Sequence, residues 1–331
     1  MKFEYTLVAF ITIIILVTAC NPTQNLSHDS LKISTKSIDA RKLSGGSSGM
    51  EQLSDTSYIV VYDIKSHKEG VRLGYVKLTN ESIDVLPIEV DSWGEEGLAS
   101  DLESICAIPG KRNEFLIAES GNWQGKLGRI FHIQIDITTL KAKVLGTMKF
   151  PLLDWNDFDL EGDQYEAMHC LAYTENERIL LMGERGGSLV NPLGILRWGI
   201  WDMKNNTLTM EGEGLNGLKF NAPGNWSNEK FKRSITDMHV DHQGIIWASA
   251  SEEKGDSGPF YSVIYKLGEI IQNDYTKPVT IFDRLSVAKE IIGFKIEALS
   301  GPDNKIDCTL TFGTEDEIYG GVWRPINIID N

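Results

Sequence analysis

Short apolar runs recur along most of the chain, and turns rich in Gly, Pro, Asn and Asp separate them. Runs of this length and spacing are typical of β-strands. No long stretch has the 3.6-residue apolar period of an amphipathic helix, so the pattern predicts an all-β domain. The expected strands cover residues 58–64, 71–78, 114–118, 129–136, 178–182, 194–202, 245–250, 261–267, 279–282 and 308–312.

A second pattern repeats over a much longer distance. Acidic residues open four apolar strands, at Glu103, Glu166, Asp237 and Glu297. These positions are 63, 71 and 60 residues apart, and a second polar cluster follows each of them after 15 to 18 residues. The acidic members of the second clusters are Glu119, Glu184, Glu252 and Glu315. Self-similarity of this period indicates a β-propeller of four-stranded blades, with five blades favoured and a sixth only if one blade is degenerate.

The ring of blades must also close, because an open sheet edge invites pairing with another chain. The strand-rich segment at residues 58–90 supplies the fifth unit. We expect the amino-terminal strands to complete a blade that residues 320–328 begin.

The repeated carboxylates predict an acidic funnel, because the first strand of every blade lines the central channel. Crowded carboxylates must take up protons at a raised pKa or share a cation, and oxygen ligands suit a hard ion such as Ca²⁺. The alternative is that each carboxylate accepts hydrogen bonds from a neighbouring blade and pins the blades together. The candidate metal ligands are Glu103, Glu119, Glu166, Glu184, Asp237, Glu297 and Glu315.

The start of the chain predicts export. Residues 7–17 are apolar but too few to span a bilayer, which is typical of a secretory signal. Cys20 follows a small residue, and this junction resembles the lipobox of bacterial lipoproteins. We expect a signal peptide at residues 1–19, then lipidated Cys20 and a flexible tether at residues 20–50, then the propeller domain at residues 51–331. An ordinary signal peptide or a short anchor helix is the alternative.

The short motifs carry a family resemblance. The segments DLESI, YEAM, GERG, SITDM, IEAL and TED begin at residues 101, 165, 183, 234, 296 and 314. In this order they resemble the phytase-like, or esterase-like, extracellular β-propeller family. The family's Gly after Glu is replaced here by Ser104, Ala167 and Ala298. The resemblance implies an extracellular propeller and phosphoesterase chemistry, in which Ca²⁺ polarises a phosphate and Arg185 or Arg233 binds it.

Other functions lose support. The sequence has no G-x-S-x-G, H-E-x-x-H, Walker or dinucleotide-binding motif. A formal net charge of −15 argues against nucleic acid and against adhesion of the protein surface to anionic lipid. Membrane contact is therefore expected through the lipid anchor, in the bacterial cell envelope, and at the outer membrane if the cell is Gram-negative. The rival function is a non-catalytic propeller that binds a protein, a glycan or a small molecule.

Three cysteines remain once Cys20 is lipidated. Cys106, Cys170 and Cys308 all lie in apolar strand contexts, which predicts buried thiols. A disulfide between Cys106 and Cys170, on neighbouring inner strands, is the alternative.

Overall fold

The structure is a computed structural model, and it describes residues 33–34, 46–78, 83–121, 128–150, 164–187, 192–252, 254–301 and 308–328. The chain divides into two compact units, residues 1–30 and residues 31–331. The described residues all belong to the second unit, so the predicted signal peptide and Cys20 lie outside them. Helix is limited here to α1 (Gly212–Asn216) and the 3₁₀ turns η1 (Glu229–Phe231) and η2 (Glu317–Tyr319). No helix of the described part is long and apolar enough to cross a bilayer.

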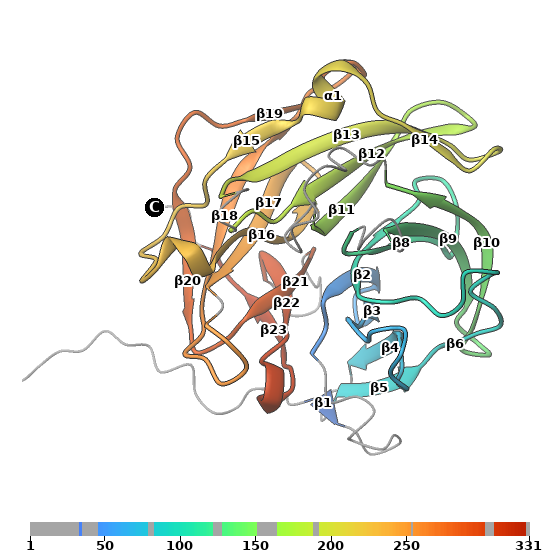
Figure 1. Cartoon of the computed structure of the whole chain (residues 1–331), viewed down its shortest axis with the longest axis horizontal. Coiled ribbons are helices and arrows are strands. Elements are labelled where there is room, and N and C mark those ends of the chain that lie inside the picture. The colour runs from blue at the N-terminus through green and yellow to red at the C-terminus, as the bar shows by residue number, and fades with distance from the viewer. Residues whose placement is uncertain are drawn as a thin grey trace, which may run out of the picture. The chain divides into compact units, whose positions relative to one another are not determined.

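Five small sheets form the five blades of a propeller (Figure 1). Blade 1 contains β2 (Gly49–Ser54), β3 (Ser57–Val61), β4 (Leu73–Leu78), β5 (Ile83–Pro87) and β1 (Ile33–Ser34). Blade 2 contains β7 (Leu102–Ala107), β8 (Glu114–Glu119), β9 (Arg129–Asp136), β10 (Lys141–Lys149) and β6 (Glu89–Val90). Blade 3 contains β11 (Tyr165–Ala172), β12 (Glu177–Glu184), β13 (Gly194–Asp202), β14 (Thr207–Thr209) and β15 (Leu218–Phe220).

Blades 4 and 5 complete the ring. Blade 4 contains β16 (Lys232–Val240), β17 (Ile245–Glu252), β18 (Tyr261–Ile270), β19 (Val279–Ile281) and β20 (Val287–Ile292). Blade 5 contains β21 (Ile296–Ser300), β22 (Leu310–Thr314) and β23 (Trp323–Ile326). The inner strands β2, β7, β11, β16 and β21 each pack against the next one, and β21 packs against β2. The prediction of an all-β propeller with five blades is confirmed.

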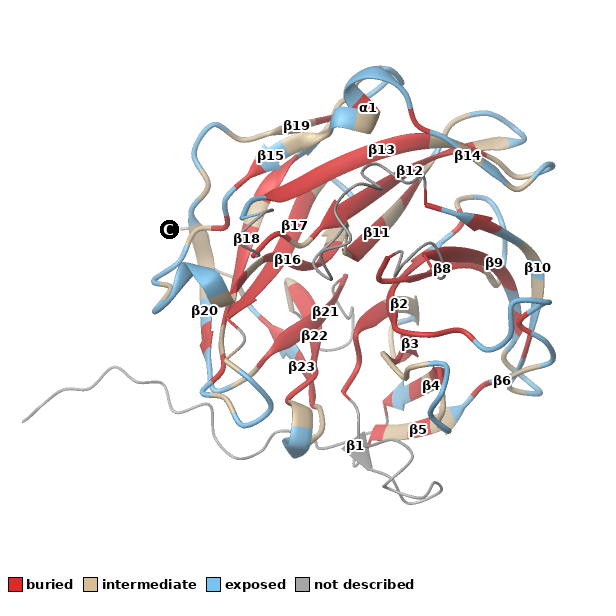
Figure 2. Cartoon of the chain, viewed as in Figure 1, coloured by how far each residue is buried: buried red, intermediate tan, exposed pale blue. Residues whose placement is uncertain are grey.

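Each pair of neighbouring blades encloses its own apolar core. The five cores lie between blades 1 and 2, 2 and 3, 3 and 4, 4 and 5, and 5 and 1. Successive residues of an inner strand face opposite sides, so Ile105 enters the core with blade 1 and Cys106 enters the core with blade 3. Because both faces of a blade are covered, the second strands β3, β8, β12, β17 and β22 are buried along almost their whole length (Figure 2).

The predicted closure of the ring is wrong. Blade 1 is built entirely from residues before Glu89, and blade 5 has its own three strands among the described residues. The two blades are joined by packing, in which Trp323 contacts the ring of Tyr58, and by the amide of Ser47, which donates to the carbonyl of Thr314 at 3.2 Å. No strand is shared between them in the described part of the chain.

The propeller also begins earlier than the sequence suggested. Residues 46–50, assigned to the tether, pack in the fold, and β2 starts at Gly49. A Cβ atom at Gly46 would lie 2.1 Å from the Thr314 carbonyl oxygen, and one at Gly49 would lie 2.8 Å from the Glu103 carbonyl oxygen. Glycine is needed here because two backbones approach closely, so a composition that indicated flexibility has a packing cause instead.

Candidate functional site at the head of the channel

Three blades carry the same irregularity near the start of the inner strand. In β7, β11 and β21 one extra residue lies between two residues that pair with consecutive residues of the next strand. The extra residues are Glu103, Glu166 and Glu297. A β-bulge redirects the side chain of its extra residue. The repeated bulge therefore brings one glutamate from each of three blades to the same end of the channel, which we call the channel head.

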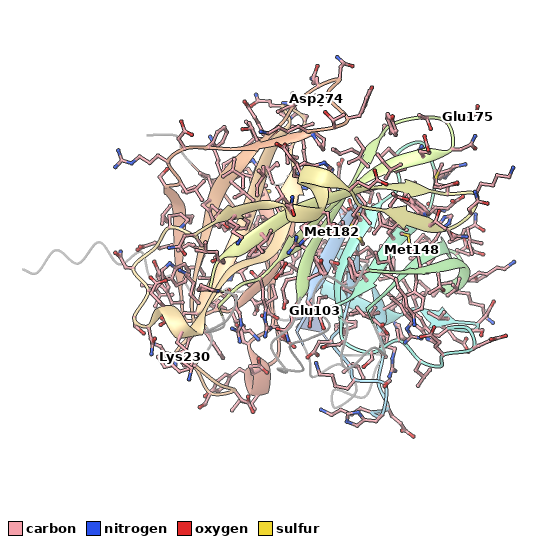
Figure 3. The ribbon with its side chains drawn as sticks, turned by 45° about the horizontal axis from the view of Figure 1, so that its top comes forward. Glu103, Met148, Glu175, Met182, Lys230 and Asp274 are labelled. Carbon is pink, nitrogen blue, oxygen red and sulfur yellow. The ribbon has the colours of Figure 1, made fainter. Side chains whose placement is uncertain are left out.

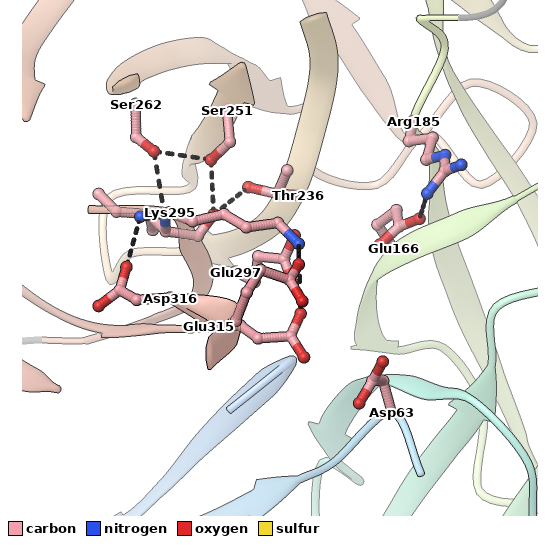
Figure 4. A network of polar contacts seen from close by, with 12 residues as sticks. Asp63, Glu166, Arg185, Thr236, Ser251, Ser262, Lys295, Glu297, Glu315 and Asp316 are labelled. Atoms are coloured by element: carbon pink, nitrogen blue, oxygen red, sulfur yellow. Dashed lines mark hydrogen bonds and ion pairs between the residues drawn. The ribbon is translucent and has the colours of Figure 1, made fainter. Parts of the chain in front are cut away.

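Other acidic residues join these glutamates. The carboxyl of Glu103 interacts electrostatically with Glu166, Asp101, Glu297 and Asp63, which come from blades 1, 2, 3 and 5. Glu315, just after β22, interacts with Glu297 and Asp63. Figure 4 shows four of these carboxylates, those of Asp63, Glu166, Glu297 and Glu315, facing one region. Glu103 itself lies well inside the molecule, whereas the turn residues Glu175, Lys230 and Asp274 lie near its margin (Figure 3).

The channel head also contains cationic side chains. The ammonium of Lys295 lies 3.0 Å from Glu297, 3.4 Å from Glu315 and 2.6 Å from Glu317 (Figure 4). Its backbone amide donates to Asp316 at 2.8 Å. Lys295 is only 4% exposed, so three carboxylates share one buried ammonium.

Two arginines and a second lysine complete the set of charges. Nη1 of Arg185 lies 3.0 Å from Oε1 of Glu166, and Arg233 also interacts with Glu166. Arg233 donates to the carbonyl of Gly187 at 3.2 Å, and Lys65 forms an ion pair with Asp101. Both arginines predicted to bind substrate are thus beside the predicted acidic residues.

Glu103 differs from the other two bulge glutamates. Its side chain is buried, with 8% of the residue exposed, and Lys65 interacts with it electrostatically, whereas Glu166 and Glu297 form ion pairs at 3.0 Å. Burial, and then the neighbouring carboxylates of Glu166 and Asp101, raise the pKa of Glu103 well above its usual range. Its surroundings therefore favour the protonated form of Glu103 more than they would for an exposed glutamate.

Glu166 occupies the same position in the next blade but a different electrostatic environment. Burial raises the pKa of Glu166 to about 7, and Arg185 limits this rise by favouring the carboxylate. Two equivalent glutamates in adjacent blades thus have different electrostatic surroundings, because Arg185 favours the carboxylate form of Glu166, whereas the carboxylates of Glu166 and Asp101 favour the protonated form of Glu103.

The structure places Glu119 and Glu184 elsewhere. Each is the last residue of the second strand of its blade and forms an ion pair with an arginine of the third strand. Glu119 lies 2.6 Å from Arg129, and it also accepts from the amides of Ser100 and Arg129 at 2.9 Å. Glu184 lies 3.0 Å from Arg197. These contacts direct both carboxylates toward arginines of their own blades.

Asp237 is also separate from the channel head. The bulged segment of β16 lies between Arg233 and Asp237, and it contains Thr236. The Asp237 carboxylate accepts from the amide of Met238 at 2.8 Å and from the amide of Leu299, in blade 5, at 2.6 Å. Asp237 therefore pins blade 4 to blade 5, as the alternative interpretation of the carboxylates had it.

The carboxylates of the channel head have the oxygen chemistry that Ca²⁺ prefers. Their arrangement fits an ion less well, because no group of three His, Cys, Asp or Glu side chains in the described residues is placed to hold a metal. Lys295 and Arg185 already neutralise Glu297 and Glu166. The calcium ion stays a prediction.

The sequence analysis did not single out Lys295, Lys65 or Asp63. Lys295 directly precedes β21, two residues before an opening glutamate, and no lysine stands at that point before Glu103 or Glu166. This difference between the repeats is the sequence signal that could have identified Lys295 as a residue of the channel head. Asp63 comes two residues after β3 and has no such mark.

Fold and site together define a five-bladed β-propeller with a charged channel head. No protein-family model matches the chain, and no curated protein matches it in sequence. Solved structures match the fold. A glycosyl hydrolase from Bacteroides ovatus has a TM-score of 0.44 at 12% identity, covering 87% of each chain.

Two further matches are of the same quality. An exo-1,5-α-L-arabinanase from a bovine ruminal metagenomic library has a TM-score of 0.44 at 9% identity, over 84% of this chain and 91% of that chain. A luciferin-regenerating enzyme has a TM-score of 0.36 at 8% identity, over 85% of this chain and 91% of that chain. At these values the likeness concerns the fold alone and carries no argument about activity.

Proposed function

We propose that the channel head is the active site of a hydrolase that cleaves anionic esters, with phosphoric monoesters as the first class to test. The observation that carries the proposal is the contrast between Glu103 and Glu166. The same bulge presents both side chains, yet Glu166 forms an ion pair with Arg185, whereas the largest electrostatic influences on Glu103 are other carboxylates. Acid and base roles are commonly divided between two carboxyl groups whose environments separate their pKa values.

The proposed chemistry uses groups that are already adjacent. Arg185 and Arg233 bind the oxyanion of the ester, since guanidinium groups pair well with phosphate. Glu166, as a carboxylate, accepts a proton from the attacking water. Glu103, as a carboxylic acid, donates a proton to the departing ester oxygen. The phytase-like motifs of the sequence support a phosphoric ester as the substrate class.

The test compares two substrates and two variants. Phenyl phosphate needs a proton at its leaving oxygen, whereas p-nitrophenyl phosphate leaves as a stable phenolate. Glu103→Gln should lower kcat for phenyl phosphate by about 100-fold or more and affect the nitrophenyl ester much less. Glu166→Gln should lower both. The rate of the unmodified protein should rise with pH through about 7, as Glu166 ionises, and it should fall once the pH is high enough for Glu103, whose pKa is raised, to lose its proton.

The melting temperature at two pH values tests whether the Glu103→Gln variant loses activity because its fold is weakened. Because the pKa of Glu103 is raised in the folded protein, its ionisation costs stability as the pH rises above the unfolded value. Glu103→Gln should therefore melt at the same temperature as the parent at pH 4.5 and at a higher temperature at pH 8. Glu96→Gln, at an exposed glutamate, is the matched control. Equal turnover in the parent and both site variants would overturn the proposal, and no turnover of any ester by the parent would favour a binding module.

Calcium is a second candidate ligand, because a buried carboxyl beside four other carboxylates can share a cation instead of holding a proton. Binding stabilises the folded state by RT ln(1 + [L]/Kd), about 2.7 kcal/mol at 100 times Kd. After chelation, added Ca²⁺ should then raise the melting temperature, and Glu103→Gln should abolish the rise while Glu89→Gln, at an exposed residue, keeps it. An unchanged melting temperature at saturating Ca²⁺ would remove calcium from the site.

We also propose that Cys20 carries the lipid and holds the propeller at the bacterial cell envelope, outside the cytoplasm. The lipobox-like junction before Cys20 supports this. Incorporation of labelled palmitate that Cys20→Ala abolishes is the test, and label retained by that variant would contradict it.

A further inference from the structure

Two cysteines meet at the boundary between blades 2 and 3. Cys106 is on β7 and Cys170 is on β11, and they are 1% and 3% exposed. Both belong to the apolar core that these two blades enclose. Neither takes part in the proposed chemistry of the channel head.

The alternation of side chains along the two strands turns the thiols toward each other. Ile105 faces blade 1 and Cys106 faces blade 3. On β11, Ala167 faces blade 4, whereas Met168 and Cys170 face blade 2. Both side chains are free thiols within the same apolar core. Two cysteines that face one core from packed neighbouring strands are on the same side of both strands, as a disulfide between them requires.

At two other blade boundaries, a side chain of one inner strand is hydrogen-bonded to the backbone of the next inner strand. Between blades 1 and 2, Glu51 on β2 accepts from the amide of Ala107 on β7 at 3.1 Å. Between blades 4 and 5, Asp237 on β16 accepts from the amide of Leu299 on β21 at 2.6 Å. In both cases a carboxylate on one inner strand accepts a hydrogen bond from a backbone amide of the next inner strand and so connects the two blades. Between blades 2 and 3 the inner strands instead place Cys106 and Cys170 in the shared core.

We propose that Cys106 and Cys170 form a disulfide that joins the inner strands of blades 2 and 3. The inference uses the expectation that the mature chain lies outside the cytoplasm, where disulfides persist. It is independent of the proposed hydrolysis.

The oxidant is an external disulfide, RSSR, such as oxidised glutathione or an oxidised thiol carrier protein. One cysteine, as a thiolate, attacks RSSR and releases RS⁻, leaving a mixed disulfide. The second thiolate attacks that mixed disulfide, forms the Cys106–Cys170 bond and releases another RS⁻. The two cysteines lose two protons and two electrons, and RSSR is reduced to two RSH.

The timing of the bond follows from burial. Burial, and then the adjacent Cys170 thiol, raise the pKa of the Cys106 thiol well above its usual range. A thiol that rarely ionises exchanges slowly. The bond therefore forms before blades 2 and 3 close over it and resists reduction afterwards.

The test is a count of alkylated thiols in the exported full-length protein. The protein is denatured in iodoacetamide with and without prior reduction, digested and analysed by mass spectrometry. The expected result is a peptide pair linked through Cys106 and Cys170, which disappears on reduction. Cys106→Ser and Cys170→Ser should each abolish the pair, and Cys308→Ser should keep it. Reduction should lower the melting temperature by roughly 5 to 10 °C, because the bond closes a long loop.

A second sample distinguishes a failed disulfide from failed export. The purified chain is held near its melting temperature with oxidised and reduced glutathione, so that the blade boundary opens and exchange can occur. A linked pair here supports the proposal even if the exported sample is reduced. Alkylation of Cys106 and Cys170 without reduction in both samples would overturn it.

Discussion

Replacing Lys295 by methionine is expected to lower the free energy of unfolding by about 3 to 5 kcal/mol at pH 8, because removing one partner of a buried ion pair leaves uncompensated charge. The ammonium of Lys295 lies within 3.4 Å of Glu297, Glu315 and Glu317. The loss should be smaller at pH 5, where Glu315, whose pKa is raised, can take up a proton. Urea unfolding at the two pH values measures both.

The sign of this pH dependence follows from Glu315. Burial and the neighbouring Glu297 raise the pKa of Glu315, and Lys295 opposes the rise. Between the unfolded and folded pKa values the folded state binds more protons than the unfolded state, so stability falls as the pH rises. Removing Lys295 should make that fall steeper. Lys149→Met removes a 3.0 Å surface ion pair with Glu96 and should change stability by less than about 0.5 kcal/mol. Equal losses at pH 5 and pH 8 would show that Lys295 acts through packing.

Glu119→Ala should be destabilising to a similar degree, about 3 to 5 kcal/mol by chemical unfolding. Arg129 is 1% exposed, so the change leaves a buried guanidinium without its carboxylate partner. The amides of Ser100 and Arg129 lose their acceptor as well. Glu89→Ala, at an exposed residue 3.9 Å from Lys141, is the control and should have little effect.

The same variant distinguishes a structural glutamate from a metal ligand. If Glu119 held calcium, Glu119→Ala would abolish stabilisation by added Ca²⁺ and cost little in its absence. The contacts with Arg129 predict the reverse, a large loss of stability that added Ca²⁺ does not change.

The architecture could be predicted from the sequence because the repeat is long and regular. The strands expected at 129–136 and 194–202 have the observed bounds of β9 and β13. Other strands, such as β5 and β10, were not predicted, because their exposed outer positions interrupt the apolar run. Strands on the outside of a blade have positions that face solvent, and these positions can hold polar residues without loss of packing.

The site was predicted in part. Glu103, Glu166, Glu297 and Glu315 do lie together, but periodicity could not tell them from Glu119 and Glu184. In a repeated fold, glutamates that form structural ion pairs recur with the same period as glutamates of the site. The arginine partners of Glu119 and Glu184 lie on another strand, so the local sequence around these glutamates does not reveal the ion pairs. Asp237 was aligned one position away from its structural equivalent, Thr236, and alternation along a strand turns such neighbours to opposite sides. The side chain of a bulged residue could not be placed from the sequence.

The seam between blades 1 and 5 has a mechanical consequence. The ring closes there through core packing and the contact of Ser47 with Thr314, whereas a shared blade would have closed it with a full ladder of strand hydrogen bonds. A pulling force applied to the amino-terminal end of the chain first meets β1, whose two residues pair with β5 at the edge of blade 1, and then reaches Gly46, which packs against Thr314 and Gly321. Once the short pairing of β1 is lost, the tension acts on the seam between blades 1 and 5, and we expect the ring to begin to open there.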